Sequence, residues 1–173
     1  MDERTLILVL RLVHILAGVF WVGAALLLSL FIAPTQRDVG PAGGPFMRQL
    51  MIGRRLSVWL MVSAALTVVS GIAMYARFSA LSNGGFAGTR HGIVLAVGGV
   101  AAILAAIVGS AIGGASARRM TAIAAQLQQA GTPPEPAVAA EMQRLQRRAG
   151  LGSAIATGLL VVATLAMAGA RYF

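Results

Sequence analysis

The first apolar run of the chain decides its fold class. Residues 6–33 read LILVLRLVHILAGVFWVGAALLLSLFIA, and the ionisable side chains within them are Arg11 and His14. A helix needs about 20 apolar residues to cross the hydrocarbon core of a bilayer, and this run is longer. It is also too long for a secretory signal peptide, lacks a small-residue cleavage site and is followed by Pro34. The run therefore predicts an uncleaved membrane-spanning helix.

Three further apolar runs follow, at residues 56–78, 92–115 and 149–170. Each must be helical, because hydrocarbon offers backbone polar groups no outside partner. The composition agrees, since 58% of the residues are hydrophobic, 11% are charged and the mean hydropathy is +0.82, whereas about a quarter of residues are charged in soluble domains. We expect an all-α, four-helix transmembrane bundle that forms a single integral-membrane domain over residues 1–173.

Proline and glycine mark the first two links between these runs. Between the first two spans, helix breaks are expected at Pro34, Gly40, Pro41, Gly43, Gly44 and Pro45. Pro45 then suits the first position of a helix, which we expect to continue straight into the second span. The link at residues 79–89 contains Asn83-Gly84-Gly85 and predicts a turn.

The third link, residues 116–148, predicts a helical hairpin. Residues 116–130 and 135–148 both have helical patterns, separated by Gly131-Thr132-Pro133-Pro134. Apolar positions recur on one side of each helix, at Met120, Ile123 or Ala124, Leu127, Val138, Met142 and Leu145. The hairpin is expected to project about 20 Å from the membrane. It is interpreted as a solvated stalk that ties spans three and four together, with a docking surface as the alternative.

The arginines predict the orientation of the chain. The net charge is +9, and all fourteen basic residues are arginines that flank the apolar runs. This distribution indicates membrane topology and argues against nucleic acid as a partner. The first and third links hold nine of them and the other side five, which favours a cytoplasmic hairpin and outward N and C termini. The nine are Arg37, Arg48, Arg54, Arg55, Arg118, Arg119, Arg144, Arg147 and Arg148.

Several kinds of chemistry are excluded by the residue types. The five acids lie outside the spans, at Asp2, Glu3, Asp38, Glu135 and Glu141. A carboxylate-based proton relay or cation transporter would keep an acid within the bilayer, and a Ser-His-acid hydrolase also needs one. Thiolate chemistry is excluded because the chain has no cysteine. No catalytic residue is predicted, and whether the protein is an enzyme stays open.

The remaining ionisable side chains gather at the outward ends of the spans. They are His14, His91, Arg11, Arg77, Arg90 and Arg171. In the first span His14, Gly18 and Trp21 share one helix face. Gly18 leaves room for a flat macrocycle or for a closely packed neighbour, and Trp21 is placed to wall such a space. Ionisable residues within a membrane are functional candidates by default.

Two cofactors suit this layer of ionisable side chains at the outward ends of the spans. Haem b would take the imidazole nitrogens of His14 and His91 as ligands, with Arg11, Arg77 and Arg90 paired to its propionates. The alternative is that backbone or water satisfies both histidines while the arginines extend to lipid phosphates.

Copper would use the same layer differently. Met74 and Met167 lie about one turn inside the outer ends of spans two and four, so that two thioethers accompany His14 and His91. Thioether and imidazole suit Cu(I). The alternative is that both methionines only fill gaps between helices.

Small residues predict close helix packing. Ser63, Thr67 and Ser70 form one stripe. Others are Gly98, Ala102, Ala105, Gly109 and Gly113 in span three, and Ser153, Thr157 and Thr164 in span four. They support a second functional hypothesis, in which the chain is a non-catalytic structural or accessory subunit that packs against a larger membrane partner or another copy of itself.

The chain also resembles the small four-span bacterial CopD-like (copper-resistance D-like) membrane proteins, many of unknown function. The resemblance rests on residues 14–23, HILAGVFWVG, on the third link and on the closing AGARYF at residues 168–173. In a wider grouping that includes the HemJ-type protoporphyrinogen oxidases, an early histidine followed by Trp and Gly implies haem or metal handling, which corresponds to His14, Trp21 and Gly23. The chain lacks the intramembrane Lys of HemJ-like proteins, and CopD proteins proper have more spans.

Overall fold

The structure is a computed structural model that describes residues 2–40, 43–130 and 135–173. Within these ranges the chain is helical throughout apart from short links, and four helices are long and apolar enough to cross a membrane. The predicted all-α fold with four spans is confirmed. The expected breaks at Pro41 and at residues 131–134 lie outside the described residues.

The first long helix continues past Pro34, so the predicted break there is wrong. Helix α1 (Glu3–Leu27) passes through a π-helical turn, η1 (Leu28–Ile32), directly into α2 (Ala33–Asp38). Proline has no N–H to donate to the carbonyl four residues earlier. The wider π turn directly before Pro34 accommodates this loss, because it shifts the hydrogen-bond register by one residue.

The first link, between the first two spans, contains its own short helix. Helix α3 (Gly43–Arg48) and the π turn η3 (Gln49–Gly53) precede α4 (Leu56–Leu81), so Pro45 is not the first helical residue. The expected straight continuation into the second span is also wrong. Arg55 has a φ of 55°, in the left-handed region, and a helix of L residues cannot run through that conformation.

The turn predicted at residues 79–89 is confirmed. Asn83 and Gly84 both have positive φ, at 50° and 84°, and the 3-10 helix η4 (Gly85–Gly88) follows. The Thr89 hydroxyl then caps α5 (Arg90–Val108) by accepting a hydrogen bond from the Gly92 amide at 2.9 Å. This cap sets where the third span begins.

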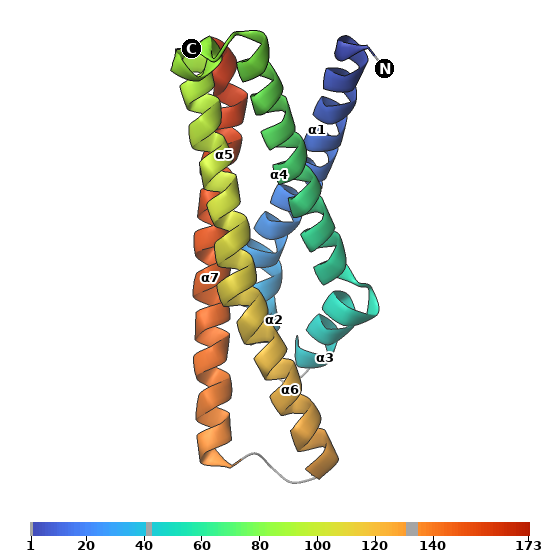
Figure 1. The fold of residues 1–173 in the computed structure, drawn as a ribbon. Coiled ribbons are helices and arrows are strands. Elements are labelled where there is room, and N and C mark those ends of the chain that lie inside the picture. Colours follow the sequence, from blue (N-terminus) through green and yellow to red (C-terminus); the bar gives the residue numbers. More distant parts are fainter. Residues whose placement is uncertain (1, 41–42, 131–134) are drawn as a thin grey trace.

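The helical hairpin is present. Helix α5 continues through the π turn η5 (Gly109–Gly114) into α6 (Ala115–Ala130), and α7 (Pro136–Gly169) returns to the 3-10 turn η6 (Ala170–Tyr172). Figure 1 shows α6 and the first half of α7 reaching beyond the other helices, while both termini lie at the opposite end. Ile123 and Leu145, from the predicted apolar sides, are buried.

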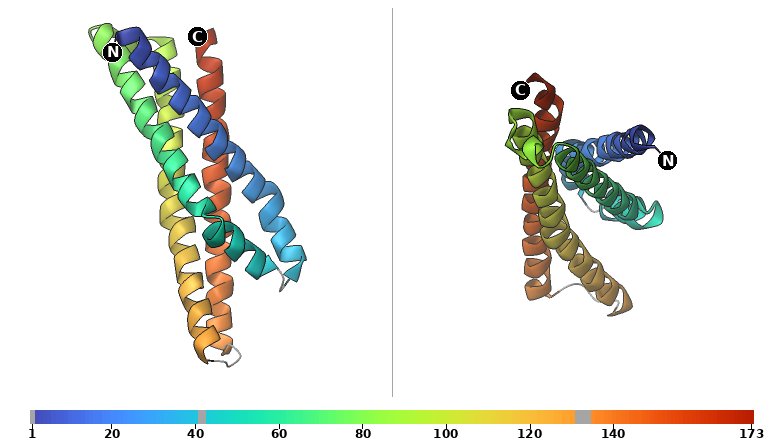
Figure 2. Two further views of the ribbon diagram at one scale, coloured as in Figure 1. Left: turned by 90° about the vertical axis from the view of Figure 1, so that its right-hand side faces the viewer. Right: turned by 45° about the horizontal axis from the view of Figure 1, so that its top comes forward.

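The four long helices pack as two pairs. The most extensive contacts join α1 to α4 and α5 to α7 (Figure 2). The pairs meet at Trp21, which is 7% exposed and lies in a cluster with small side chains such as Ala102, Ala105 and Ala163. Small residues let helix backbones approach closely where no hydrophobic force acts between helices.

The outer surface of the bundle is apolar. Large apolar side chains are exposed on all four long helices, including Leu16 at 72%, Val69 at 65% and Leu165 at 67%. Water would penalise such a surface, and lipid does not. The fold is therefore that of a multi-pass membrane protein.

Candidate functional site

His14 joins the first helix pair. It projects from α1 toward α4, and its Nδ1 lies 2.8 Å from the backbone carbonyl oxygen of Thr67. A carbonyl oxygen only accepts, so Nδ1 carries the hydrogen and donates it. In the neutral ring Nε2 then bears the free lone pair. Ser70 Oγ lies 3.3 Å from the same Nδ1.

Glycine and hydroxyl side chains on α4 make room for this imidazole. A Cβ atom at Gly71 would lie 2.9 Å from His14 Cε1, closer than real contacts allow. Thr67 Oγ1 and Ser70 Oγ donate to carbonyl oxygens of their own helix, at 2.7 and 2.5 Å. The predicted stripe of Ser63, Thr67 and Ser70 is buried, and its Thr67 and Ser70 are the residues that His14 meets.

His91 joins the second helix pair by the same kind of bond. Its Nδ1 donates to the backbone carbonyl oxygen of Ala170, at the end of α7, over 2.7 Å. The Phe86 ring packs against it edge to face, with the ring centroids 5.8 Å apart. As in His14, the bond to a carbonyl assigns the hydrogen to Nδ1 and leaves the lone pair on Nε2.

The two histidines contact different helices. His14 lies about three turns into α1 and meets α4, whereas His91 is the second residue of α5 and meets the end of α7. Both are half-buried in the half of the molecule that carries the termini. The structure thus gives each helix pair one histidine with an oriented ring.

Gly18 and Trp21 take packing positions. A Cβ at Gly18 would touch Thr67 Cγ2 at 3.6 Å, so α4 is the closely packed neighbour beside this glycine. Trp21 belongs to the central core cluster. Both residues therefore lie where helices pack against each other.

The arginines of this end lie at the surface. Arg77 Nη1 forms an exposed ion pair with Glu3 Oε2 at 3.5 Å, which joins α4 to the start of α1. Arg11 and Arg90 are exposed. Arg171 lies against the Tyr172 ring, with its guanidinium carbon 4.7 Å from the centroid.

Each helix pair also carries one of the two methionines predicted as copper ligands, Met74 and Met167. Met167 reaches Gly98 of α5, where its Cε would be 3.4 Å from an added Cβ, and it lies about one turn from Ala170. Met74 is half-buried on α4, about one turn beyond Gly71. In the part of the chain that the structure describes, no three His, Cys, Asp or Glu side chains gather into a metal-binding group.

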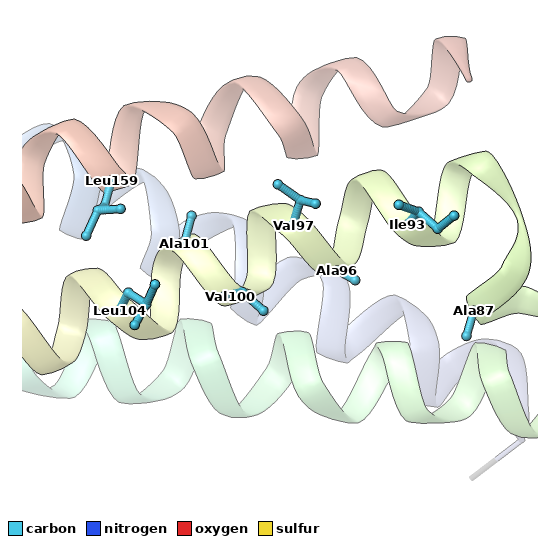
Figure 3. A pocket seen from close by; sticks show the side chains of 8 residues that line it. All are labelled: Ala87, Ile93, Ala96, Val97, Val100, Ala101, Leu104 and Leu159. Carbon is cyan, nitrogen blue, oxygen red and sulfur yellow. The ribbon is translucent and has the colours of Figure 1, made fainter.

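An apolar groove along α5 was not predicted from the sequence. It has a volume of about 440 Å³ and is lined mainly by α5, with Leu159 contributed by α7 and Ala87 by the link before α5 (Figure 3). Its α5 side chains include Ile93, Val97, Val100 and Leu104, whose spacing follows one helix face. That spacing is the sequence signal that could have located the groove.

Comparisons with known protein families, with curated proteins and with solved structures found no match to this chain.

Proposed function

We propose that this chain is a small integral-membrane protein that binds haem or copper through histidine Nε2 atoms. The observation that supports the proposal is the shared hydrogen-bonding of His14 and His91, whose Nδ1 atoms donate to backbone carbonyls. Histidines that ligate metals characteristically use their second ring nitrogen in this way, because the bond fixes the tautomer and orients the ring. The Nε2 lone pairs are the ones that a metal would use.

For haem, His14 and His91 would hold the group through Nε2, with one imidazole from each helix pair. The exposed guanidiniums of Arg11 and Arg90 would pair with the carboxylates of the macrocycle. Haem would supply one-electron transfer when bound. The role of the chain is to hold both imidazoles in a fixed orientation through their Nδ1 hydrogen bonds.

For copper, each helix pair would supply one imidazole and one thioether, from His14 with Met74 and from His91 with Met167. These soft and borderline donors suit Cu(I). Met74 lies about one turn along α4 from Gly71, which packs against His14. Met167 lies about one turn from Ala170, which accepts the hydrogen bond of His91. Both spacings support this choice.

The haem proposal is tested on protein purified from haem-supplemented cells. We expect a Soret band that His14→Asn or His91→Asn reduces or removes. Asparagine retains an amide that can donate to the carbonyl but has no Nε2 ligand, so these variants preserve the interhelical bond. A colourless wild-type preparation, or a band unchanged in both variants, would refute haem binding.

The copper proposal is tested by elemental analysis after growth with copper. Met167→Leu and Met74→Leu should lower the bound copper, whereas Met61→Leu, at a position that is 66% exposed on α4, should not. Copper below stoichiometric amounts in the wild type, or equal retention in all three variants, would count against the metal.

We also propose a bacterial inner membrane, as the resemblance to the four-span CopD-like proteins implies, with the hairpin in the cytoplasm and the termini outward, on the distribution of the arginines. The chain has no cysteine, so single cysteines introduced at the exposed Ser82 and Ala117 report orientation. An impermeant maleimide added to intact spheroplasts should label Ser82→Cys alone. Labelling of Ala117→Cys alone would reverse the orientation.

The groove on α5 favours a second candidate function, an accessory subunit that packs against a larger membrane protein. Its lining is almost wholly apolar, as expected of a surface that accepts another helix. Val97→Trp would fill the groove and should release a stoichiometric partner that gentle detergent recovers with the wild type. Val69→Trp, on the exposed face of α4, is the matched control. A monomer without a partner would reject this candidate.

A further inference from the structure

A second hollow lies at the base of the hairpin. It has a volume of about 250 Å³ and lies between the π turn η5, the start of α6 and the first half of α7. Its lining is partly polar and partly apolar, and consists of Ala111, Ile112, Ala115, Ser116, Leu145 and Arg148. It is separate from both histidines. His91 lies at the other end of α5, and His14 lies in the other helix pair.

The position along the helices places this hollow at a membrane surface. Ala111 lies about 20 residues after Arg90, and Arg148 about 20 residues before Ala170. At 1.5 Å per residue, each distance is about 30 Å, the thickness of the hydrocarbon core. If Arg90 and Ala170 mark one surface, the hollow lies in the headgroup layer of the other.

Two arginines from different helices flank the hollow. Arg148 on α7 lines it directly. Arg118 lies on α6, about one turn beyond Ala115, and its Nη1 would be 3.6 Å from a Cβ at Gly114, so its guanidinium lies beside η5, which forms part of the hollow. Both residues are exposed, whereas Ser116 is 6% exposed and adds a hydroxyl to the wall.

The surrounding charge is positive. The half of the molecule with the hairpin holds nine arginines and three acids, and one of these acids, Glu141, pairs with Arg119 at 3.1 Å. No carboxylate contributes to the lining of the hollow. The local field therefore favours an anion.

The floor is apolar and closely packed. Ile112 packs against Gly152 so closely that a Cβ there would lie 2.8 Å from it, and Leu145 is 7% exposed. A free phosphate ion has no apolar atoms to pack on this floor, whereas the glycerol and upper acyl atoms of a phospholipid would cover it.

We propose that this hollow binds the phosphodiester of an anionic phospholipid. The Arg148 and Arg118 guanidiniums donate charge-assisted hydrogen bonds to the phosphate oxygens, and Arg148 offers the bidentate geometry that phosphate matches. Basic pockets between membrane helices are established sites of headgroup recognition. The proposal does not depend on haem or copper binding.

The test is native mass spectrometry of the full chain with phosphatidylglycerol and phosphatidylcholine added in equal amounts. Wild type should retain phosphatidylglycerol, and Arg148→Gln should lower its occupancy about tenfold, the effect of losing hydrogen bonds to a charged group. Arg147→Gln removes the same charge one residue away, outside the lining, and should change occupancy less than about twofold. Equal losses in the two variants, or equal retention of the two lipids, would overturn the proposal.

Two further arms separate the sources of phosphate and guard against misfolding. Inorganic phosphate at millimolar concentration should not displace the lipid; displacement that depends on Arg148 would assign the hollow to a soluble phosphate instead. Arg148→Lys keeps the charge without the planar fork and should bind between wild type and Arg148→Gln. If Arg148→Lys retained as much phosphatidylglycerol as Arg147→Gln, the result would contradict a bidentate contact from Arg148.

Discussion

The imidazole of His14 occupies the space that a side chain at Gly71 would need. A Cβ on that glycine would lie 2.9 Å from Cε1 and 3.2 Å from Nδ1 of the ring. The same ring donates to the carbonyl oxygen of Thr67, one turn earlier on α4. The orientation of His14 therefore depends both on a missing side chain and on a backbone acceptor of the neighbouring helix.

The first prediction is that Gly71→Ala destabilises the first helix pair by about 1–3 kcal/mol, because the added methyl group overpacks the contact with His14. The double variant His14→Ala with Gly71→Ala should lose less than the sum of the single changes, since the ring is absent. Unfolding in a denaturing detergent gives both values. Gly99→Ala, which meets nothing within 4 Å on α5, is the control. Strict additivity would contradict the contact.

A second prediction concerns two glycines of α7. At Gly152 a Cβ would lie 2.8 Å from Ile112 Cγ2, whereas at Gly158 it would meet nothing within 4 Å. Gly152→Ala should therefore separate α7 from η5 and lower stability by about 1–3 kcal/mol. Gly158→Ala should be neutral or raise stability by up to about 1 kcal/mol through helix propensity. Reversed effects in the detergent-unfolding assay would show that α7 packs through another face.

A third prediction distinguishes the two tryptophans. Trp21 is 7% exposed at the meeting of the helix pairs, and Trp59 on α4 is 61% exposed. Trp21→Ala should cost about 3 kcal/mol, because it leaves a cavity between the pairs, and Trp59→Ala should cost much less. In vesicles, brominated lipids should quench the fluorescence of Trp59 in the Trp21→Phe variant more strongly than that of Trp21 in Trp59→Phe. Equal quenching would contradict the burial of Trp21.

A fourth prediction concerns pH at the start of α1. Hydrogen bonding to the side chain of Thr5, and secondly to its backbone amide, lowers the pKa of Asp2; the amide lies 3.3 Å from Oδ1. Because the pKa in the folded protein is depressed, the cap is fully present above the ordinary aspartate pKa of about 3.9 and is lost as pH falls through the lower value.

The Thr5 amide resonance, followed by NMR, should therefore shift at a pH below about 3.9. In Asp2→Ala the same resonance should not titrate over that range, because the capping carboxylate is gone. A titration that persists in Asp2→Ala would assign the shift to another group.

The apolar runs predicted the helical spans well. The second span was expected at residues 56–78, and α4 covers Leu56–Leu81. The hairpin sides that Ile123 and Leu145 mark were also predicted, and both residues are buried. Local pattern sufficed because each of these helices satisfies its own backbone and buries one face against its immediate neighbour.

The breaks were predicted less well. Pro34 was expected to end a helix, but the π turn η1 absorbs its missing donor. Arg55 carries no sequence signal for a positive φ, yet it bends the chain before α4. In both places the packing of the surrounding helices outweighs the propensity of one residue.

The candidate site was also predicted only in part. His14, His91 and the nearby arginines stood out as rare ionisable residues beside long apolar runs. Their partners, Thr67 O and Ala170 O, are backbone atoms that carry no sequence signal, and Gly71 was not singled out because any glycine in a span suits close packing.

The amino-acid sequence by itself determined that four segments are helices in lipid, because an apolar chain in hydrocarbon must satisfy its backbone internally. Only the tertiary structure decided that α1 pairs with α4 and α5 with α7, and so which carbonyl each imidazole meets. The physical reason is that small side chains along each span permit close approach on several faces, and the choice among these faces depends on the packing of all four helices together.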